Sequence, residues 1–247
     1  MSPNPVHDLI RRHSSVRQYT DAPIDEDLLK EIVCCGQAAS SSSFIQAYSL
    51  VRVCNHDKRK TIAEAAGGQA WVAAAPEFLV ICADLQRVAY ACRKADAGEL
   101  EGWTEHFITA TVDAALMAQN MMLAAEAAGL GGVFIGGIRN DPTTVAELLA
   151  LPKQVYPVFG LCLGWPAQRN PVKPRFPVEA IVHTDRYDAQ GVPGYVDAYD
   201  QTMMDYYRTR DSNARQSDWS TQTAAAVQGK KRQHMLGFLQ ARGFLKR

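Results

Sequence analysis

The chain has 247 residues, of which 47% are hydrophobic and 21% are charged, with 26 basic and 26 acidic residues. This is ordinary globular composition, which excludes a disordered or fibrous protein, and the length allows one large domain or two small ones. The zero net charge lacks the basic excess with which nucleic-acid binders displace counterions, so we expect no nucleic-acid partner.

The first third of the chain predicts a mixture of helices and strands. Asn4 followed by Pro5 is typical of a helix start, and residues 6–13 then form a short helix. Residues 22–40 have acidic residues in their opening turn and apolar residues at helical spacing, which indicates a second helix. Two strands are predicted where β-branched and apolar residues dominate, at residues 47–54 and 76–84.

The longest apolar segment, residues 106–129, is the predicted core helix, which ends at Gly129. Its polar residues, including Asp113 and Glu126, indicate a buried helix and not a membrane span, so we expect no membrane partner. Further strands are predicted at residues 131–137, 155–166 and 180–185. After Pro193 the pattern returns to helix, at residues 196–210 and 219–242.

These elements indicate one α+β domain over residues 1–247, with a helical C-terminal extension at about 193–247. The N-terminus has no signal-peptide pattern, and the six cysteines show no CxxC or metal-ligand spacing. We therefore expect a cytoplasmic protein with free thiols. The six histidines also lack ligand-pair spacing, so no metal site is expected.

Three donor-rich clusters are candidate anion sites: residues 13–17, the serines 40–43 followed by Phe44, and Lys173-Pro174-Arg175. Planar arginine forks bind phosphate through paired, charge-assisted hydrogen bonds. Each cluster taken alone is more often solvated surface. The glycine run at 129–137 does not match GxGxxG, and it fits a tight helix-to-strand turn about as well as a ligand site.

Eight segments along nearly the whole chain occur in a specific order. They are HSSVRQYTDAPI (13–24), SSSSFIQ (40–46), GGQ (67–69), MAQN (117–120), GLGGVFIGGIRND (129–141), FGLCLGWP (159–166), KPRFP (173–177) and YYRTRDSNARQSDWS (206–220). In this order they resemble the nitroreductase/flavin reductase superfamily, specifically its NADPH-dependent, oxygen-insensitive nitroreductase and NADPH–FMN oxidoreductase subgroup. The resemblance implies a nitroreductase-like fold, with a central, mostly antiparallel sheet flanked by helices, in an intertwined homodimer. The helix at 106–129 is our candidate for the dimer interface.

The resemblance also implies FMN as the cofactor and assigns residues to its site. The implied phosphate and ring contacts are His13, Ser14, Ser15, Arg17, Lys173 and Arg175. The implied contacts closer to the ring are Ser41 and Ser43 from the partner subunit, Gln69 at the polar edge, and Ile135, Gly136 and Gly137. Glycine suits such a position because a side chain there would block a flat ring.

Ser14 departs from the family, which usually has an arginine at this position. The missing guanidinium weakens FMN binding or shifts the flavin potential, unless Arg12, one turn away, compensates. If the site is compromised, an FMN-binding protein with little turnover is an alternative.

The same resemblance implies NADPH as the electron donor. Arg210 and Arg215 match positions assigned to its 2′-phosphate, although a mobile basic loop with no single role fits them nearly as well. Arg232 resembles a residue at the mouth of the substrate site, and Phe44 resembles one that stacks over it. The implied reaction is ping-pong: NADPH reduces the flavin, NADP⁺ leaves, and nitroaromatics, quinones or free flavin take two electrons.

No side-chain nucleophile or obligatory general acid is expected, because the cofactor performs the chemistry. Two further alternatives stay open. The chain could be chiefly a flavin reductase that supplies reduced FMN to a partner. It could also be a thiol-based redox protein that uses the adjacent Cys34 and Cys35.

Overall fold

The structure, a computed structural model, describes residues 4–168, 170–210, 215–229 and 232–247. The chain divides into two compact units by its internal contacts. The first unit comprises Met1–Asn170 and Arg232–Arg247, and the second comprises Pro171–Lys231. The C-terminal residues therefore return to the first unit.

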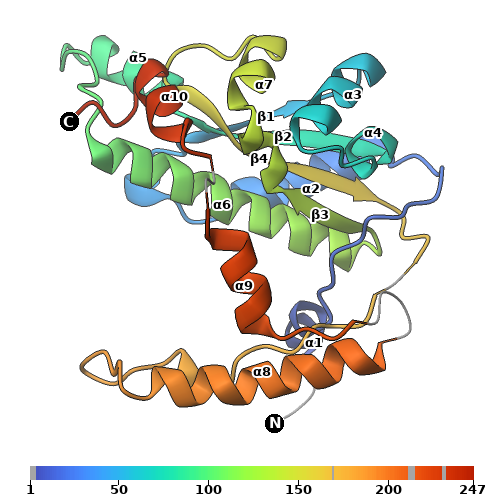
Figure 1. The fold of residues 1–247 in the computed structure, drawn as a ribbon. Coiled ribbons are helices and arrows are strands. Elements are labelled where there is room, and N and C mark those ends of the chain that lie inside the picture. The colour runs from blue at the N-terminus through green and yellow to red at the C-terminus, as the bar shows by residue number, and fades with distance from the viewer. Residues whose placement is uncertain (1–3, 169, 211–214, 230–231) are drawn as a thin grey trace. The chain divides into compact units, whose positions relative to one another are not determined.

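A four-stranded antiparallel sheet forms the centre of the first unit (Figure 1). Its strands lie in the order β1-β2-β4-β3. They are β1 (Tyr48–Arg52), β2 (Glu77–Asp84), β3 (Gly131–Ile135) and β4 (Val155–Gly164). Every residue of β2 is buried, and its alternate side chains enter different clusters. Leu79 and Ile81 join one cluster, and Phe78 and Val80 join the other, so the sheet separates two hydrophobic cores.

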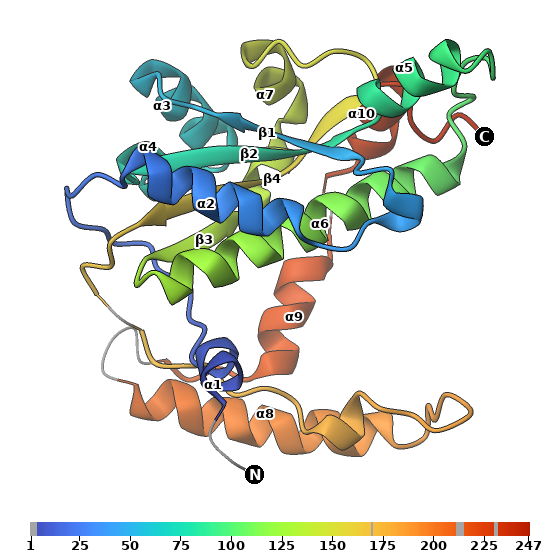
Figure 2. The same cartoon turned by 180° about the vertical axis from the view of Figure 1, so that it is seen from behind.

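Helices cover both faces of this sheet. On one face α2 (Glu26–Gln37) packs beside α6 (Thr104–Ala127), as Figure 2 shows. The opposite face is covered by α3 (His56–Ala65), α4 (Trp71–Ala74) and α7 (Pro142–Leu148). The remaining helices of the unit are α1 (Pro5–Arg11), α5 (Gln86–Lys94) and α10 (Met235–Ala241), with the short 3₁₀ helices η1 (Ser42–Phe44) and η2 (Gly136–Asn140).

The predicted core helix is confirmed as α6. By length and composition this helix could cross a membrane. However, Met117, Met121 and Met122 are at most 1% exposed within the protein, as expected of a core helix. The helix ends at Ala127, two residues before the predicted end, and Gly129 follows with a φ of 88°, a left-handed conformation that stops helices.

The second unit contains η3 (Val178–Ala180), α8 (Val192–Thr209) and α9 (Trp219–Val227). An aromatic cluster holds it together. Tyr199, Met203 and Tyr207 of α8 are buried, and the ring of Phe176 packs on that of Tyr199 with centroids 3.9 Å apart.

Two sequence predictions are wrong. Residues 180–185 form no strand: η3 ends at Ala180, Ile181 and Val182 are 66% and 62% exposed, and no strand in the described part of the chain pairs with them. Residues 219–242 form two helices, α9 and α10, instead of one. The break includes Gly229 and Arg232, whose φ values of 83° and 52° are incompatible with a right-handed helix.

Candidate active site

The segment from His13 to Arg17 runs beside β3. It is fixed there by the buried Val16, whose backbone N–H donates to the carbonyl of Gly132 at 2.9 Å. Successive side chains of an extended segment point to opposite sides. With Val16 in the core, Ser15 stays half-buried and Arg17 exposed, which leaves both accessible to a ligand.

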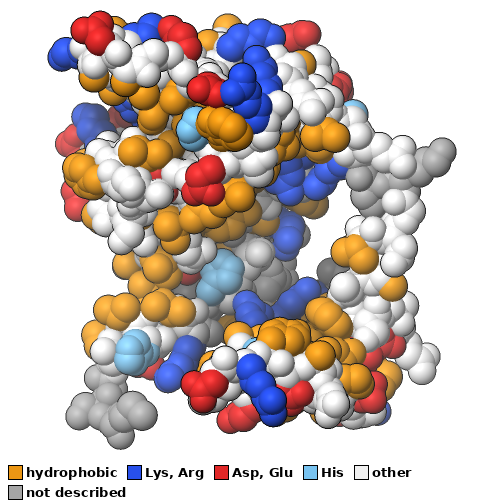
Figure 3. Space-filling model, turned by 90° about the vertical axis from the view of Figure 1, so that its left-hand side faces the viewer, with side chains coloured by type: hydrophobic (Ala, Val, Ile, Leu, Met, Phe, Trp, Pro, Cys, Tyr) orange, Lys and Arg blue, Asp and Glu red, His pale blue; other side chains and the backbone are white. Residues whose placement is uncertain are grey.

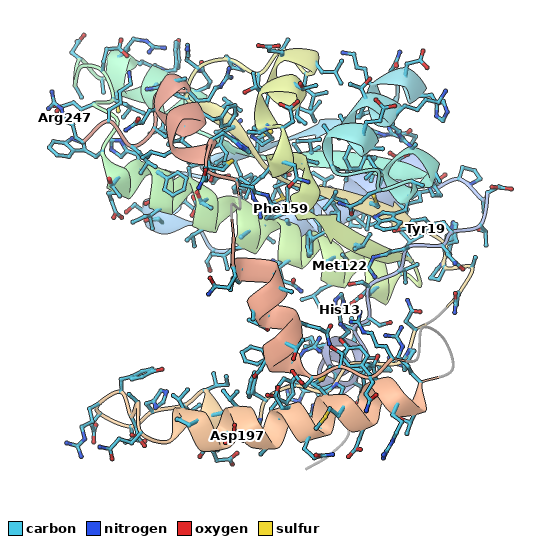
Figure 4. The ribbon with its side chains drawn as sticks, in the orientation of Figure 1. His13, Tyr19, Met122, Phe159, Asp197 and Arg247 are labelled. Atoms are coloured by element: carbon cyan, nitrogen blue, oxygen red, sulfur yellow. The ribbon has the colours of Figure 1, made fainter. Side chains whose placement is uncertain are left out.

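His13 is held by an acidic residue of α6. The imidazole Nδ1–H donates to Glu126 Oε1 at 2.6 Å, and the Glu126 side chain is only 11% exposed. Figure 4 shows His13 beside the part of α6 that carries Met122. The bond occupies Nδ1 and leaves Nε2 of His13 for a ligand. The other carboxylate oxygen of Glu126 is buried and has no hydrogen-bond partner among the described residues.

The structure brings Gln69 and Gly137 together, although they are far apart in sequence. Gln69 Nε2 donates to the carbonyl of Ala66 at 2.8 Å. A Cβ on Gly137 would lie closer than 3.0 Å to both of those groups, so only glycine fits. The guanidinium of Arg17 lies 5.7 Å from the ring centroid of Trp71, two residues after Gln69. The first donor cluster, the glutamine and the glycine pair therefore share one region of the first unit.

Two arginines flank the glycine pair. Arg139 Nη2 is the nearest group to a Cβ built on Gly136, at 3.2 Å. Burial first, and then the charge of Arg232, lower the pKa of Arg139, so the two guanidinium groups influence each other. Arg232 Nε donates to Asn140 Oδ1 at 2.9 Å. This contact places Arg232 next to η2, which begins at Gly136.

The serine cluster lies elsewhere. Ser41, Ser43 and Phe44 belong to the loop between α2 and β1, and Phe44 is 79% exposed. Among the described residues, no hydrogen bond connects this loop with residues 13–17, Gln69 or the glycine pair. The structure of a single chain thus does not bring the serines to the first donor cluster.

Three basic residues of the second unit lie around one tyrosine ring. Lys173, Arg210 and Arg215 lie 5.6, 5.8 and 4.5 Å from the ring centroid of Tyr207. Arg175 is held by its own segment, because its Nη1 donates to the carbonyl of Lys173 at 2.8 Å. Residues 211–214, between the two predicted NADPH-binding arginines, lie outside the described part of the chain.

Replacing Arg215 with alanine is expected to raise the pKa of Tyr207. Burial raises the pKa of this hydroxyl, but hydrogen bonds with Arg215, Lys173 and Gln222 and the charge of Lys173 together bring it below its ordinary value. Loss of one cation destabilises the phenolate, which moves deprotonation to higher pH. Ultraviolet difference titration against a Tyr207→Phe variant isolates this hydroxyl.

The matched control is Arg208→Ala. Arg208 is exposed and pairs with Asp205 at 2.9 Å, so its loss is expected to leave the pKa of Tyr207 nearly unchanged. An unshifted titration in the Arg215→Ala variant would show that the guanidinium does not act on Tyr207.

Several residues near these clusters escaped the sequence analysis as site residues. They are Trp71, Asp113, Glu126, Arg139 and Tyr207. In the sequence, Asp113 and Glu126 were used only as polar residues that argue against a membrane span. A lone carboxylate in an otherwise apolar core helix is nevertheless a usable signal, because a buried charge requires a specific partner.

The adjacent cysteines are not placed as a reactive pair. Cys34 is exposed and Cys35 is half-buried on α2. Burial and the neighbouring Glu31 raise the pKa of Cys35, which lowers its thiolate population. This argues against the thiol-based alternative. Among the described residues, no group of three or more His, Cys, Asp or Glu side chains could hold a metal ion.

The sequence of this chain matches known protein families and relatives. Residues 10–165 match the nitroreductase family, and residues 173–247 match the C-terminal domain of the nitroreductase family. The chain is 43% identical to the NADPH-flavin oxidoreductase of Vibrio harveyi over 99% of this chain and 100% of that protein. It is 40% identical to the oxygen-insensitive NADPH nitroreductase of Salmonella typhimurium, with the same coverage.

A solved structure gives the same result. The NADPH:FMN oxidoreductase from Vibrio harveyi, complexed with NAD⁺, matches with a TM-score of 0.89 and 40% identity, over 99% of this chain and 100% of that chain. The resemblance and the α+β fold predicted from the sequence are confirmed.

Proposed function

This chain belongs to the nitroreductase family, and from that premise we propose that it is an FMN-dependent oxidoreductase that transfers two electrons from NADPH to small electron-poor acceptors. The observation that carries the proposal is the juxtaposition of Gln69 with Gly137, the second residue of the glycine pair. It offers an amide side chain next to backbone that a flat ring can approach. The names of the relatives, which include an NADPH nitroreductase and an NADPH-flavin oxidoreductase, support the same activity.

We assign the phosphate of FMN to the first donor cluster. His13, Ser15 and Arg17 supply an imidazole, a hydroxyl and a guanidinium, the donor set that a phosphate requires. Lys173 and Arg175 of the second unit are proposed as further phosphate contacts on the strength of the family resemblance. Ser14 is proposed as a weaker, hydroxyl contact.

We propose that Arg12 does not replace the guanidinium that Ser14 lacks. Its Nε donates to the carbonyl of Asp8 at 3.1 Å, so its side chain is engaged with the helix that precedes the site. Arg17 is therefore the guanidinium of this segment that we assign to the cofactor.

We assign the flavin ring to the backbone of Ile135, Gly136 and Gly137, with Gln69 at its polar edge and Ser41 and Ser43 contributed by a partner subunit. The fit is supported by the space beside Gly136, where the three atoms nearest to a Cβ all belong to the far end of the Arg139 side chain. FMN held by these residues would supply the hydride-accepting and two-electron chemistry of the reaction. The chain binds and orients the reactants and supplies no catalytic side chain.

On the substrate side, Arg210 and Arg215 are proposed to bind the 2′-phosphate of NADPH. Both lie beside the ring of Tyr207, which supports a cationic binding site. It argues against the alternative of a mobile basic loop with no single role. Arg232 is proposed at the mouth of the acceptor site, which its bond to Asn140 next to the glycine pair supports. Phe44 is proposed to stack on the acceptor.

We propose that the active species is a homodimer. On α6 the apolar side chains of Ile108, Val112 and Leu116 are 48%, 49% and 44% exposed. They recur every four residues, so they form one apolar stripe on the helix surface. A second copy of the chain would remove this stripe from water.

We further propose that residues 1–247 act as one FMN-dependent domain, with the C-terminal helices from about residue 193 as its extension. Figure 3 shows basic, acidic and hydrophobic side chains side by side on one face of the molecule, which supports small molecules as partners over nucleic acid. The free cysteines among the described residues support a cytoplasmic location.

Steady-state kinetics test the proposed activity. With NADPH and a nitroaromatic varied together, we expect parallel double-reciprocal lines, because NADP⁺ leaves before the acceptor binds. Intersecting lines would contradict a ping-pong reaction. The second candidate, a flavin reductase that supplies reduced FMN, is supported by the relative named NADPH-flavin oxidoreductase. A larger kcat/KM for free FMN than for nitroaromatics and quinones would favour it.

A further inference from the structure

The loop between α2 and β1 has an unusual backbone. Ser43, Phe44 and Gln46 adopt φ values of 46°, 57° and 51°. These lie in the left-handed region, which residues other than glycine rarely occupy. Three such residues within four positions persist only where the surroundings over-determine the conformation. The loop therefore requires an anchor.

Arg87 Nη2 donates to the carbonyl of Gln46 at 3.1 Å, but the anchor that contacts both ends of the segment is Asp113 of α6. Its side chain is buried, with only 1% of the residue exposed, and both carboxylate oxygens accept hydrogen bonds from the loop backbone. The N–H of Ser42 donates to Oδ1 at 2.9 Å, and the N–H of Ala47 donates to Oδ2 at 3.1 Å. One carboxylate thus ties both ends of the left-handed segment to the core helix.

In the described part of the chain, the hydrogen-bond partners of this carboxylate are uncharged. Among the described residues, no Lys, Arg or His forms an ion pair with Asp113. A buried charge is costly unless hydrogen bonds compensate it, and here the compensating donors are the two backbone N–H groups of the loop. The loop and the carboxylate therefore stabilise each other, and loss of either bond is expected to release the loop.

The strained residues of this loop present side chains at the surface. Ile45 is half-buried and packs on the core, but Phe44 is 79% exposed and Ser43 is also exposed. Backbone strain that holds exposed side chains in place is typical of functional sites. The residues presented in this way include Ser41, Ser43 and Phe44, which the proposed function places at the flavin and the acceptor.

We propose that Asp113 is a positioning residue for the oxidoreductase reaction: it holds residues 42–47 in the left-handed conformation that presents Ser43 and Phe44 to the flavin and the acceptor. The proposal rests on the proposed function for the role of the presented side chains. The anchoring itself rests on geometry and is tested separately.

The first test is Asp113→Asn. The amide is close to isosteric, but only one of its two ends accepts hydrogen bonds, so one loop N–H loses its partner. We expect faster amide hydrogen exchange across residues 42–47, with exchange in β2 unchanged. In the FMN-loaded protein we expect kcat/KM for a quinone acceptor to fall about tenfold, which corresponds to one lost hydrogen bond to a charged group.

The second variant, Ser42→Pro, leaves Asp113 in place. Proline removes the N–H that donates to Oδ1. Ser42 is the first residue of η1 and follows Ser41, which is extended with φ −134° and ψ 153°, so proline fits the backbone there. The same changes in exchange and in kcat/KM are expected. This variant tests the anchor even if Asp113→Asn does not fold.

The matched control is Thr109→Val. Thr109 is also a buried polar residue of α6, one turn before Asp113, and its hydroxyl donates to Glu105 and not to the loop. We expect unchanged loop exchange and unchanged kcat/KM. A double variant, D113N/Q46G, places glycine at one of the left-handed positions. Glycine adopts this conformation without strain, so we expect the double variant to recover part of the kcat/KM that D113N loses.

Unchanged loop exchange in both D113N and S42P would overturn the anchor. Faster loop exchange with unchanged kcat/KM would overturn the positioning role. A loss of kcat/KM in Thr109→Val equal to that in D113N would show a general effect of damage to α6. This result would also overturn the positioning role of Asp113. Failure of the proposed function is distinguishable, since the unaltered protein would then not oxidise NADPH with any acceptor, whereas the exchange result would stand.

Discussion

Replacing Gly136 with valine is expected to raise the Kd for FMN about 100-fold, the upper end of the cost of forcing extra carbon atoms into a filled site. In the protein alone, the nearest group to a Cβ at this position is Nη2 of Arg139, at 3.2 Å, and a small shift at the far end of that side chain relieves the contact. The Tm of the apoprotein should therefore change little. Fluorescence titration of apoprotein with FMN measures the Kd, and calorimetry measures the Tm.

Gly137→Ala is the matched contrast. Its Cβ would lie closer than 3.0 Å to the backbone carbonyl of Ala66, so we expect the apoprotein itself to lose stability. The Gly136 variant thus tests whether FMN binding requires glycine, and the Gly137 variant tests whether folding requires it. FMN binding to the Gly136→Val variant with unaltered Kd would show that the ring does not approach this backbone.

Replacing Arg210 and Arg215 together with alanine is expected to raise the KM for NADPH about 100-fold, because each hydrogen bond to a charged group contributes about 1.5–3 kcal/mol. The KM for NADH should change far less, since NADH lacks the 2′-phosphate. Both arginines lie on the ring of Tyr207, which places them close to each other. Initial rates at varied NADPH and NADH measure the difference.

Arg208→Ala provides the control for general loss of charge. Arg208 lies two residues before Arg210 and pairs with Asp205, so its removal is expected to alter both coenzymes slightly and equally. Equal increases of KM for NADPH and NADH in the Arg210/Arg215 double variant would contradict the assignment of these residues to the 2′-phosphate.

The strands and the core helix could be predicted because their patterns are long and strong. β2 and β4 are continuous apolar runs, as expected of strands buried on both faces. Short helices such as α3, α5 and α7 were not predicted, because seven to ten residues give few turns from which to recognise a period. At 180–185 the apolar composition was misleading, since nothing in the sequence shows whether a strand has a neighbour to pair with.

The site could be predicted in part. The order of motifs identified Gln69 and the glycine pair, and the structure brings them together. It could not identify the role of Asp113, because that role depends on the backbone N–H of Ser42, 71 residues away in sequence. The same holds for Glu126, which pairs with His13 over 113 residues. Tertiary folding supplies these partners, and no local pattern records them.

The central claim is that this chain binds FMN and reduces it with NADPH. The most direct test is the visible spectrum of the purified protein, before and after one equivalent of NADPH without oxygen. We expect a yellow protein that bleaches promptly and regains its colour when a quinone or nitroaromatic is added. A colourless protein that does not take up added FMN, or a yellow protein that NADPH does not bleach, would contradict the claim.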